Sequence, residues 1–124
     1  MRERDLFYMP ILGAGGQHPA ITLRVVQDRS KGVLIFGTGS GPSTPMYQAE
    51  PYVEVLPRPE LNGRILDFYK VTYFYARNVR WAMANALDPT GRRCPLDLFV
   101  RLLKLAEQYA LIKPSAAIPV PAPP

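Results

Sequence analysis

The sequence predicts an α+β protein, in which a small antiparallel sheet of about four strands over residues 6–56 precedes a helical hairpin over residues 59–113. Three observations predict this class. Short apolar or alternating runs separated by glycine and proline fill the first half, apolar residues at helical spacing fill the second half, and a proline-rich segment closes the chain. We therefore expect one domain over residues 1–113 and an extended tail over residues 114–124.

Four segments of the first half have the pattern of strands: LFYMPIL (6–12), AITLRVVQ (20–27), VLIFG (33–37) and YVEVL (52–56). DRSKG (28–32) forms a turn between the second and the third, because Gly32 can adopt a left-handed backbone conformation. GTGSGPSTP (37–45) is a long loop. A dinucleotide site or a P-loop requires its glycines to run into a helix, and here two prolines follow instead, so we assign this loop no phosphate-binding role.

Residues 59–87 change period and predict one long helix. At about 100° per residue their apolar side chains fall within one sector, as an amphipathic helix requires. The alternation of a strand fails, because Asp67 would share a face with Ile65 and Tyr69. Pro59 suits the first helical turn, and Asp88 before a proline ends the helix. The residues expected on its core side are Ile65, Phe68, Tyr69, Thr72, Tyr75, Ala76, Val79, Met83, Ala86 and Leu87.

A second helix is predicted over residues 95–113, after a short turn at residues 88–94. Pro95 suits its first position, and Asp97 is favourably placed in its first turn. Its circumference is mostly apolar, so we expect it to be covered on more than one side. Cys94 stands at its start without an adjacent base of the kind that nucleophilic catalysis requires, so we assign it no catalytic role.

The composition favours a binding protein over an enzyme. The net charge is +5, and a cationic surface attracts phosphates or acidic protein surfaces. The sequence contains no catalytic motif and no metal-ligand set, so we expect no cofactor and no metal. A single cysteine, a charged N-terminus and the lack of a long apolar run predict a cytoplasmic or virion-associated protein with no membrane partner.

One stripe of the predicted long helix alternates cations with aromatic rings. It consists of Lys70, Phe74, Arg77 and Trp81, and Arg80 borders it. Three interpretations stay open: bases stack on the rings while the cations bind phosphates, the stripe binds another protein, or the two rings simply pack in the core. Exposure of the Phe74 and Trp81 rings decides between them. The predicted hairpin and inter-helix turn add five further candidate cations: Arg24, Arg29, Lys31, Arg92 and Arg93.

The predicted order of four strands and a helix, with a basic hairpin, resembles the unit of Whirly-type single-stranded-DNA-binding proteins over residues 20–80. The resemblance lies in element order and charge, without a shared motif, and it assigns no site residue.

Two functions of different classes follow. The first is a small, non-enzymatic protein, a homo-oligomer or part of a complex, that binds single-stranded nucleic acid through a cationic and aromatic surface. The alternative is an accessory or assembly subunit of a larger complex, encoded by a phage or mobile element. It would bind another protein, such as one with an acidic surface, through the long helix and the proline-rich tail.

Overall fold

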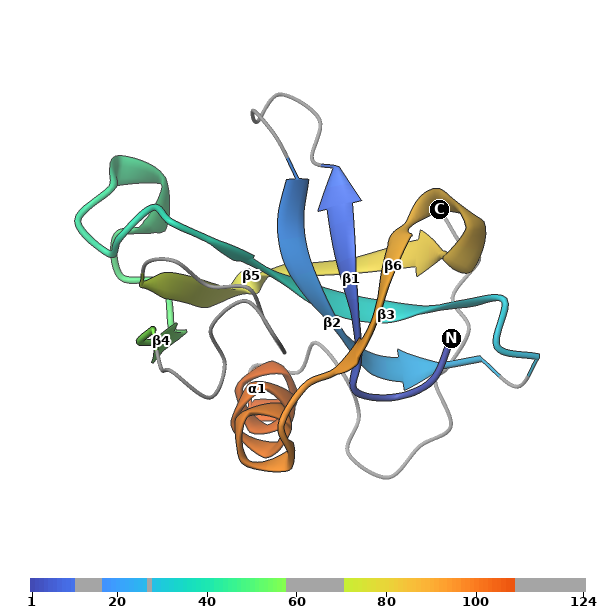
Figure 1. Cartoon of the computed structure of the whole chain (residues 1–124). Helices are drawn as coiled ribbons and strands as arrows, with labels where there is room; N and C mark the ends of the chain where they lie inside the picture. The colour runs from blue at the N-terminus through green and yellow to red at the C-terminus, as the bar shows by residue number, and fades with distance from the viewer. Residues whose placement is uncertain (11–16, 27, 58–70, 109–124) are drawn as a thin grey trace.

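Six strands pair in one antiparallel sheet, and one α-helix packs against it (Figure 1). The computed structural model describes residues 1–10, 17–26, 28–57 and 71–108, and the elements below belong to these residues. The order across the sheet is β4-β5-β3-β2-β1-β6. The strands are β1 (Asp5–Pro10), β2 (Gln17–Val25), β3 (Lys31–Thr38), β4 (Tyr52–Val55), β5 (Thr72–Met83) and β6 (Asp88–Arg93), and the helix is α1 (Leu96–Gln108). Single 3₁₀ turns cover Pro45–Tyr47 and Ala84–Ala86.

The predicted α+β class with a helical hairpin is wrong, and the fold is largely β. Within the range predicted as one long helix, Thr72–Met83 forms the longest strand of the described sheet, and residues 59–70 lie outside the described residues. The resemblance to Whirly-type proteins depended on a helix in this range. In the described part of that range the chain forms a strand, so the resemblance loses its support.

A large irregularity in β5 explains why its sequence imitates a helix. Ile35 of β3 pairs with Val79, but Gly37 pairs with Phe74, so residues 75–78 of β5 face a single residue of β3. Such a bulge breaks the two-residue alternation of a strand. In addition, β5 is buried on both sides at this point, and Phe74, Tyr75 and Ala76 are all buried in succession. Positions 72, 74, 76 and 78 are buried in alternation, but Thr72 and Asn78 are polar and Tyr75 between them is buried as well, so the apolar residues of the sequence do not show the strand period.

The other predicted elements overlap observed ones. The four strand segments predicted in the first half overlap β1, β2, β3 and β4, and the second predicted helix contains α1. The segment predicted as a turn at residues 88–94 is instead mostly strand β6, which pairs with β1 at the sheet edge. Residues 109–113 of the predicted helix and the tail at 114–124 lie outside the described residues.

The sheet has a buried cluster on each face. Residues that alternate along the strands, such as Leu6, Ile21 and Ile35, form the larger cluster with Leu98 and Leu102 of α1. Their neighbours point to the opposite face, where a smaller cluster consists of Phe7, Met9, Ala20, Leu34, Phe36 and Leu87. Figure 1 shows α1 on one side of this strongly twisted sheet. Both faces of the central strands β2 and β3 thus carry core residues.

The helix of the described ranges is too short to cross a membrane.

Candidate nucleic-acid interface

The two rings of the predicted stripe belong to the core. Phe74 is fully buried in the cluster that includes α1, and Trp81 is partly buried and packs against the same cluster. Lys70 lies outside the described residues. The interpretation of this segment as an exposed stripe of cations and rings is therefore wrong, because strand geometry sends Phe74 and Trp81 to the side covered by α1.

The two arginines of β5 are exposed but partly engaged by backbone carbonyls. The Arg77 guanidinium donates to the carbonyl of Met46 at 2.9 Å, so it holds the loop that precedes β4. The Arg80 guanidinium donates to the carbonyl of Arg77 at 2.9 Å and lies 5.6 Å from the centre of the Phe36 ring. Both arginines add positive charge to this strand, and neither lies beside an exposed stacking ring of the predicted stripe.

The cations predicted in the β2–β3 hairpin do not form a common site. Arg24 is largely buried and forms ion pairs with Glu107 of α1 at 3.0 Å and with Glu3 at 3.5 Å, so it links β2 to the helix. Arg29 is exposed in the turn with a φ of 62°, and Lys31 is half-buried at the start of β3. Arg24 therefore has a structural role, and only the hairpin tip remains as basic surface.

The remaining predicted cations, Arg92 and Arg93, lie on β6 beside the start of β1. Asp5 pairs directly with Arg93, and the register then shifts: Leu6 pairs with Arg92, but Phe7 pairs with Pro89. Two residues of β6 are thus inserted opposite one step of β1. The inserted Gly91 has a φ of 72°, a conformation that glycine adopts without strain.

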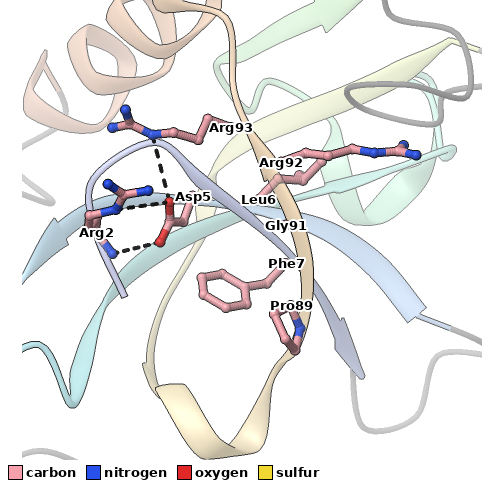
Figure 2. Close-up of a pocket in the computed structure, with 8 residues that line it drawn as sticks. All are labelled: Arg2, Asp5, Leu6, Phe7, Pro89, Gly91, Arg92 and Arg93. Carbon is pink, nitrogen blue, oxygen red and sulfur yellow. Dashed lines mark hydrogen bonds and ion pairs between the residues drawn. The ribbon is translucent and has the colours of Figure 1, made fainter.

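This irregularity is held by one side chain and opens a pocket. The Thr90 hydroxyl donates to the Leu6 carbonyl at 2.7 Å and accepts from the Arg92 amide at 3.1 Å. A Cβ atom added at Gly91 would meet no atom within 4 Å, so there is open space beside the strand there. The resulting pocket of about 150 Å³ is lined by Arg2, Asp5, Leu6, Phe7, Pro89, Gly91, Arg92 and Arg93 (Figure 2).

Two arginines converge on one carboxylate in this pocket. The Nε atoms of Arg2 and Arg93 lie 3.9 and 3.8 Å from Asp5 Oδ1, and the Arg2 amide donates to Asp5 Oδ2 at 2.8 Å. Figure 2 shows the Nε atoms of both arginines joined to Asp5 by dashed lines. The two Nε distances exceed hydrogen-bond range, so these are ion pairs that leave most guanidinium N–H donors unused by Asp5. Arg93 uses one of them, a donation from Nη2 to the Glu3 carbonyl at 2.8 Å.

Arg92 extends away from this carboxylate, as Figure 2 shows. Among the residues that the structure describes, its guanidinium forms neither an ion pair nor a hydrogen bond. The Arg92 hydrogen bond to the Thr90 hydroxyl comes from the backbone amide. The lining of this pocket therefore gathers three arginines against one aspartate. This arrangement can bind an anion whose oxygens accept several N–H donors, and carboxylate and phosphate are the anions that match the planar guanidinium fork.

Neither the family models nor the curated proteins match this chain. The interpretation of the site therefore rests on its geometry.

A tyrosine cluster lies at the opposite edge of the sheet. Tyr75 is fully buried, stacks on Tyr47 at 3.8 Å between ring centres and donates to the carbonyl of Ser40 at 2.7 Å. Burial, and next the neighbouring Tyr47, raise the pKa of Tyr75 to about 12. Tyr52 and Tyr73 pack edge to face above it at 5.9 Å and reach the surface.

A carboxylate accompanies the two outer tyrosines. Tyr73 pairs across the strands with Glu54. Burial, and next the charge of Glu54, raise the pKa of Tyr73. Tyr52 is exposed and Tyr73 half-buried, so these two rings offer aromatic surface, and the carboxylate of Glu54 lies beside them rather than a cation.

The two charged residues that β1 and the segment before it contribute to the pocket, Arg2 and Asp5, were not predicted from the sequence. They lie more than 80 residues from β6 along the chain, and no local pattern predicts that pairing. The charged run MRERD is the one signal that was present, because a strand beginning at Asp5 would bring its cations to a sheet edge. Cys94 is buried in the core, and burial raises the pKa of its thiol to about 12, which opposes a nucleophilic role.

Proposed function

We propose that this chain is a non-enzymatic protein that binds single-stranded nucleic acid, and that the arginines of the β1–β6 edge bind its phosphates. The observation that carries the proposal is the grouping of Arg2, Arg92 and Arg93 around one pocket with a single carboxylate. The net charge of +5 supports the same partner. A cytoplasmic or virion location, where such a partner occurs, is part of the proposal.

The pocket supplies phosphate contacts rather than base contacts. Its one aromatic residue, Phe7, is 7% exposed and belongs to the core, so its ring is not available for stacking. Tyr52 is exposed and the neighbouring Tyr73 is half-buried, and unpaired bases can stack on rings of this kind. We therefore expect binding that tolerates many sequences and depends strongly on salt.

Fluorescence anisotropy with a labelled single strand tests this proposal through a matched pair of variants. R92A/R93A removes two cations of the β1–β6 edge, and R101A/K104A removes two exposed cations of α1. For a single strand, log affinity falls with log salt with a slope of about −0.7 for each phosphate contacted. R92A/R93A should weaken binding and reduce the size of this slope by about 1.4, whereas R101A/K104A should leave both close to the wild-type values.

Two results would refute the proposal. The first is the absence of binding at low salt. The second is an equal loss of affinity in both variants, since binding would then depend on total charge and not on this edge. A duplex of the same sequence that binds more tightly than the single strand would contradict the strand preference.

A protein contact is the second candidate function, and the opposite sheet edge favours it. Among the described strands β4 is terminal in the sheet, and Tyr52 at its start and Leu56 just after it are 43% and 57% exposed. The long helix on which this alternative first rested is absent from residues 72–83, and the proline-rich tail lies outside the described residues. If this edge mediates self-association, sedimentation equilibrium should show an oligomer that Leu56→Glu converts to a monomer. A monomeric wild-type chain would exclude the homo-oligomer.

A further inference from the structure

The β1–β6 pocket already contains an anion, the side chain of Asp5. Its Oδ1 lies between the Nε atoms of Arg2 and Arg93, at 3.9 and 3.8 Å. The Asp5 side chain is 20% exposed, and those of Arg2 and Arg93 are 59% and 42% exposed, so solvent reaches all three. An anion that binds both arginines must therefore compete with this carboxylate.

We infer that this pocket holds a terminal phosphate, a phosphate monoester at the end of a nucleic-acid strand, and that Asp5 competes with it for Arg2 and Arg93. The inference rests on the proposed function, because it names the part of the strand that enters the pocket.

The charge of the incoming group selects a terminal phosphate. A phosphodiester within a strand carries one negative charge, so exchanging it for the Asp5 carboxylate leaves the charge opposite the arginines unchanged. A phosphate monoester carries a charge of about −1.5 to −2 at neutral pH and has three strong acceptor oxygens. Only a phosphate monoester therefore increases the negative charge opposite the arginines when it displaces the Asp5 carboxylate.

The donors that a phosphate needs are present and underused. Each guanidinium has five N–H donors in a planar fork. The long Nε contacts to Asp5 are ion pairs without hydrogen bonds, and Arg93 uses only Nη2 on the Glu3 carbonyl. Three phosphate oxygens can satisfy these donors better than one carboxylate held at nearly 4 Å.

The pocket also has suitable dimensions and an open side. Its volume of about 150 Å³ accepts a phosphate group but leaves little room for a base and a sugar. The side at Gly91, which lines the pocket, is open, since no atom lies within 4 Å of a Cβ built there. A strand end can therefore enter through this side while the rest of the strand stays outside.

The test compares two otherwise identical single strands that carry a 5′-phosphate or a 5′-hydroxyl. An additional unit charge at about 4 Å from an arginine in water contributes about 1 kcal/mol, which corresponds to about fivefold in affinity. We expect the wild-type protein to bind the 5′-phosphorylated strand about fivefold more tightly. R2A should abolish this preference.

Asp5→Asn tests the competition directly, and Glu3→Gln is its matched control. Both substitutions remove one negative charge from the same segment, but the Glu3 carboxylate pairs with Arg24 outside the pocket. Asparagine keeps an oxygen that can accept from the Arg2 amide. D5N should therefore bind both strands about fivefold more tightly than the wild-type protein, whereas E3Q should change affinity less than twofold. If D5N fails to fold, the R2A result decides.

The outcomes separate this inference from the proposed function. Equal affinity for the two strands, with both bound, would overturn the inference and leave the proposed function standing. Binding of thymidine 5′-monophosphate and of neither strand would support the phosphate site and refute the proposed function. Equal increases in D5N and E3Q would overturn the competition. A phosphoserine peptide that binds more tightly than the phosphorylated strand would overturn the assignment of the ligand to nucleic acid.

Discussion

Replacement of Phe74 by alanine should destabilise the protein strongly. The ring is fully buried between the sheet and α1, and its Cζ would lie 2.9 Å from a Cβ built on Gly37, so glycine is needed there to make room for it. A buried aromatic side chain removes about 150–250 Å² from water, which at about 25 cal/mol per Å² is worth about 4–6 kcal/mol. Alanine retains part of this contribution, and the central strands restrict collapse of the cavity, so we expect a loss of about 3–5 kcal/mol.

Met83→Ala is the matched control on the same strand. The helical interpretation placed Met83 on the core side and Phe74 on the outer stripe, and the strand reverses both assignments, with Met83 44% exposed. Equilibrium unfolding in urea, followed by the fluorescence of Trp81 and by circular dichroism, measures both variants. We expect M83A to lose less than about 1 kcal/mol. A small loss in F74A together with a large one in M83A would refute the strand assignment.

Three further outcomes follow from individual contacts. Gly37→Ala should lose about 1–3 kcal/mol of stability in the same unfolding assay, because its Cβ would lie 2.6 Å from Thr72 Cγ2; an unchanged midpoint would contradict this packing. Tyr75→Phe should lose about 1 kcal/mol through the missing donation to Ser40, and a gain in stability would show that this bond is not formed. Burial raises the pKa of the Cys94 thiol from 9.0 to about 12, so the thiol of the unfolded chain ionises at lower pH than that of the folded chain. The free energy of unfolding should therefore fall between these pH values, by at most about 1.4 kcal/mol per pH unit. Cys94→Ala should remove this pH dependence, and a pH profile that the substitution leaves unaltered would refute it.

The sequence predicted those elements whose pattern is local and regular. α1 has apolar residues at helical spacing with a proline just before it, and β2 alternates, so both were found near their observed ranges. β5 was missed because the bulge at residues 75–78 breaks its alternation and because both of its faces are buried there. The β-branched and aromatic content of its sequence was a correct indication of a strand, and the periodicity outweighed it wrongly.

The candidate site was predictable only in part. Arg92 and Arg93 stood out as a basic pair, but their partners come from the other end of the chain, and only the pairing of β1 with β6 brings Arg2 and Asp5 beside them. Arg24 looked like a free cation in the hairpin, yet it is engaged by Glu107, which lies 83 residues away. Long-range pairing of this kind decides whether a cation is available, and it leaves no trace in local spacing.

An NMR titration of the isotopically labelled protein with a 5′-phosphorylated single strand shows residue by residue where the strand binds. We expect the largest chemical-shift changes at the Nε–H groups of Arg2 and Arg93 and at the amides of Thr90, Gly91 and Arg92. These changes should diminish as salt is raised. Changes confined to Tyr52, Tyr73 and their neighbours, or no changes at low salt, would contradict binding at the β1–β6 pocket.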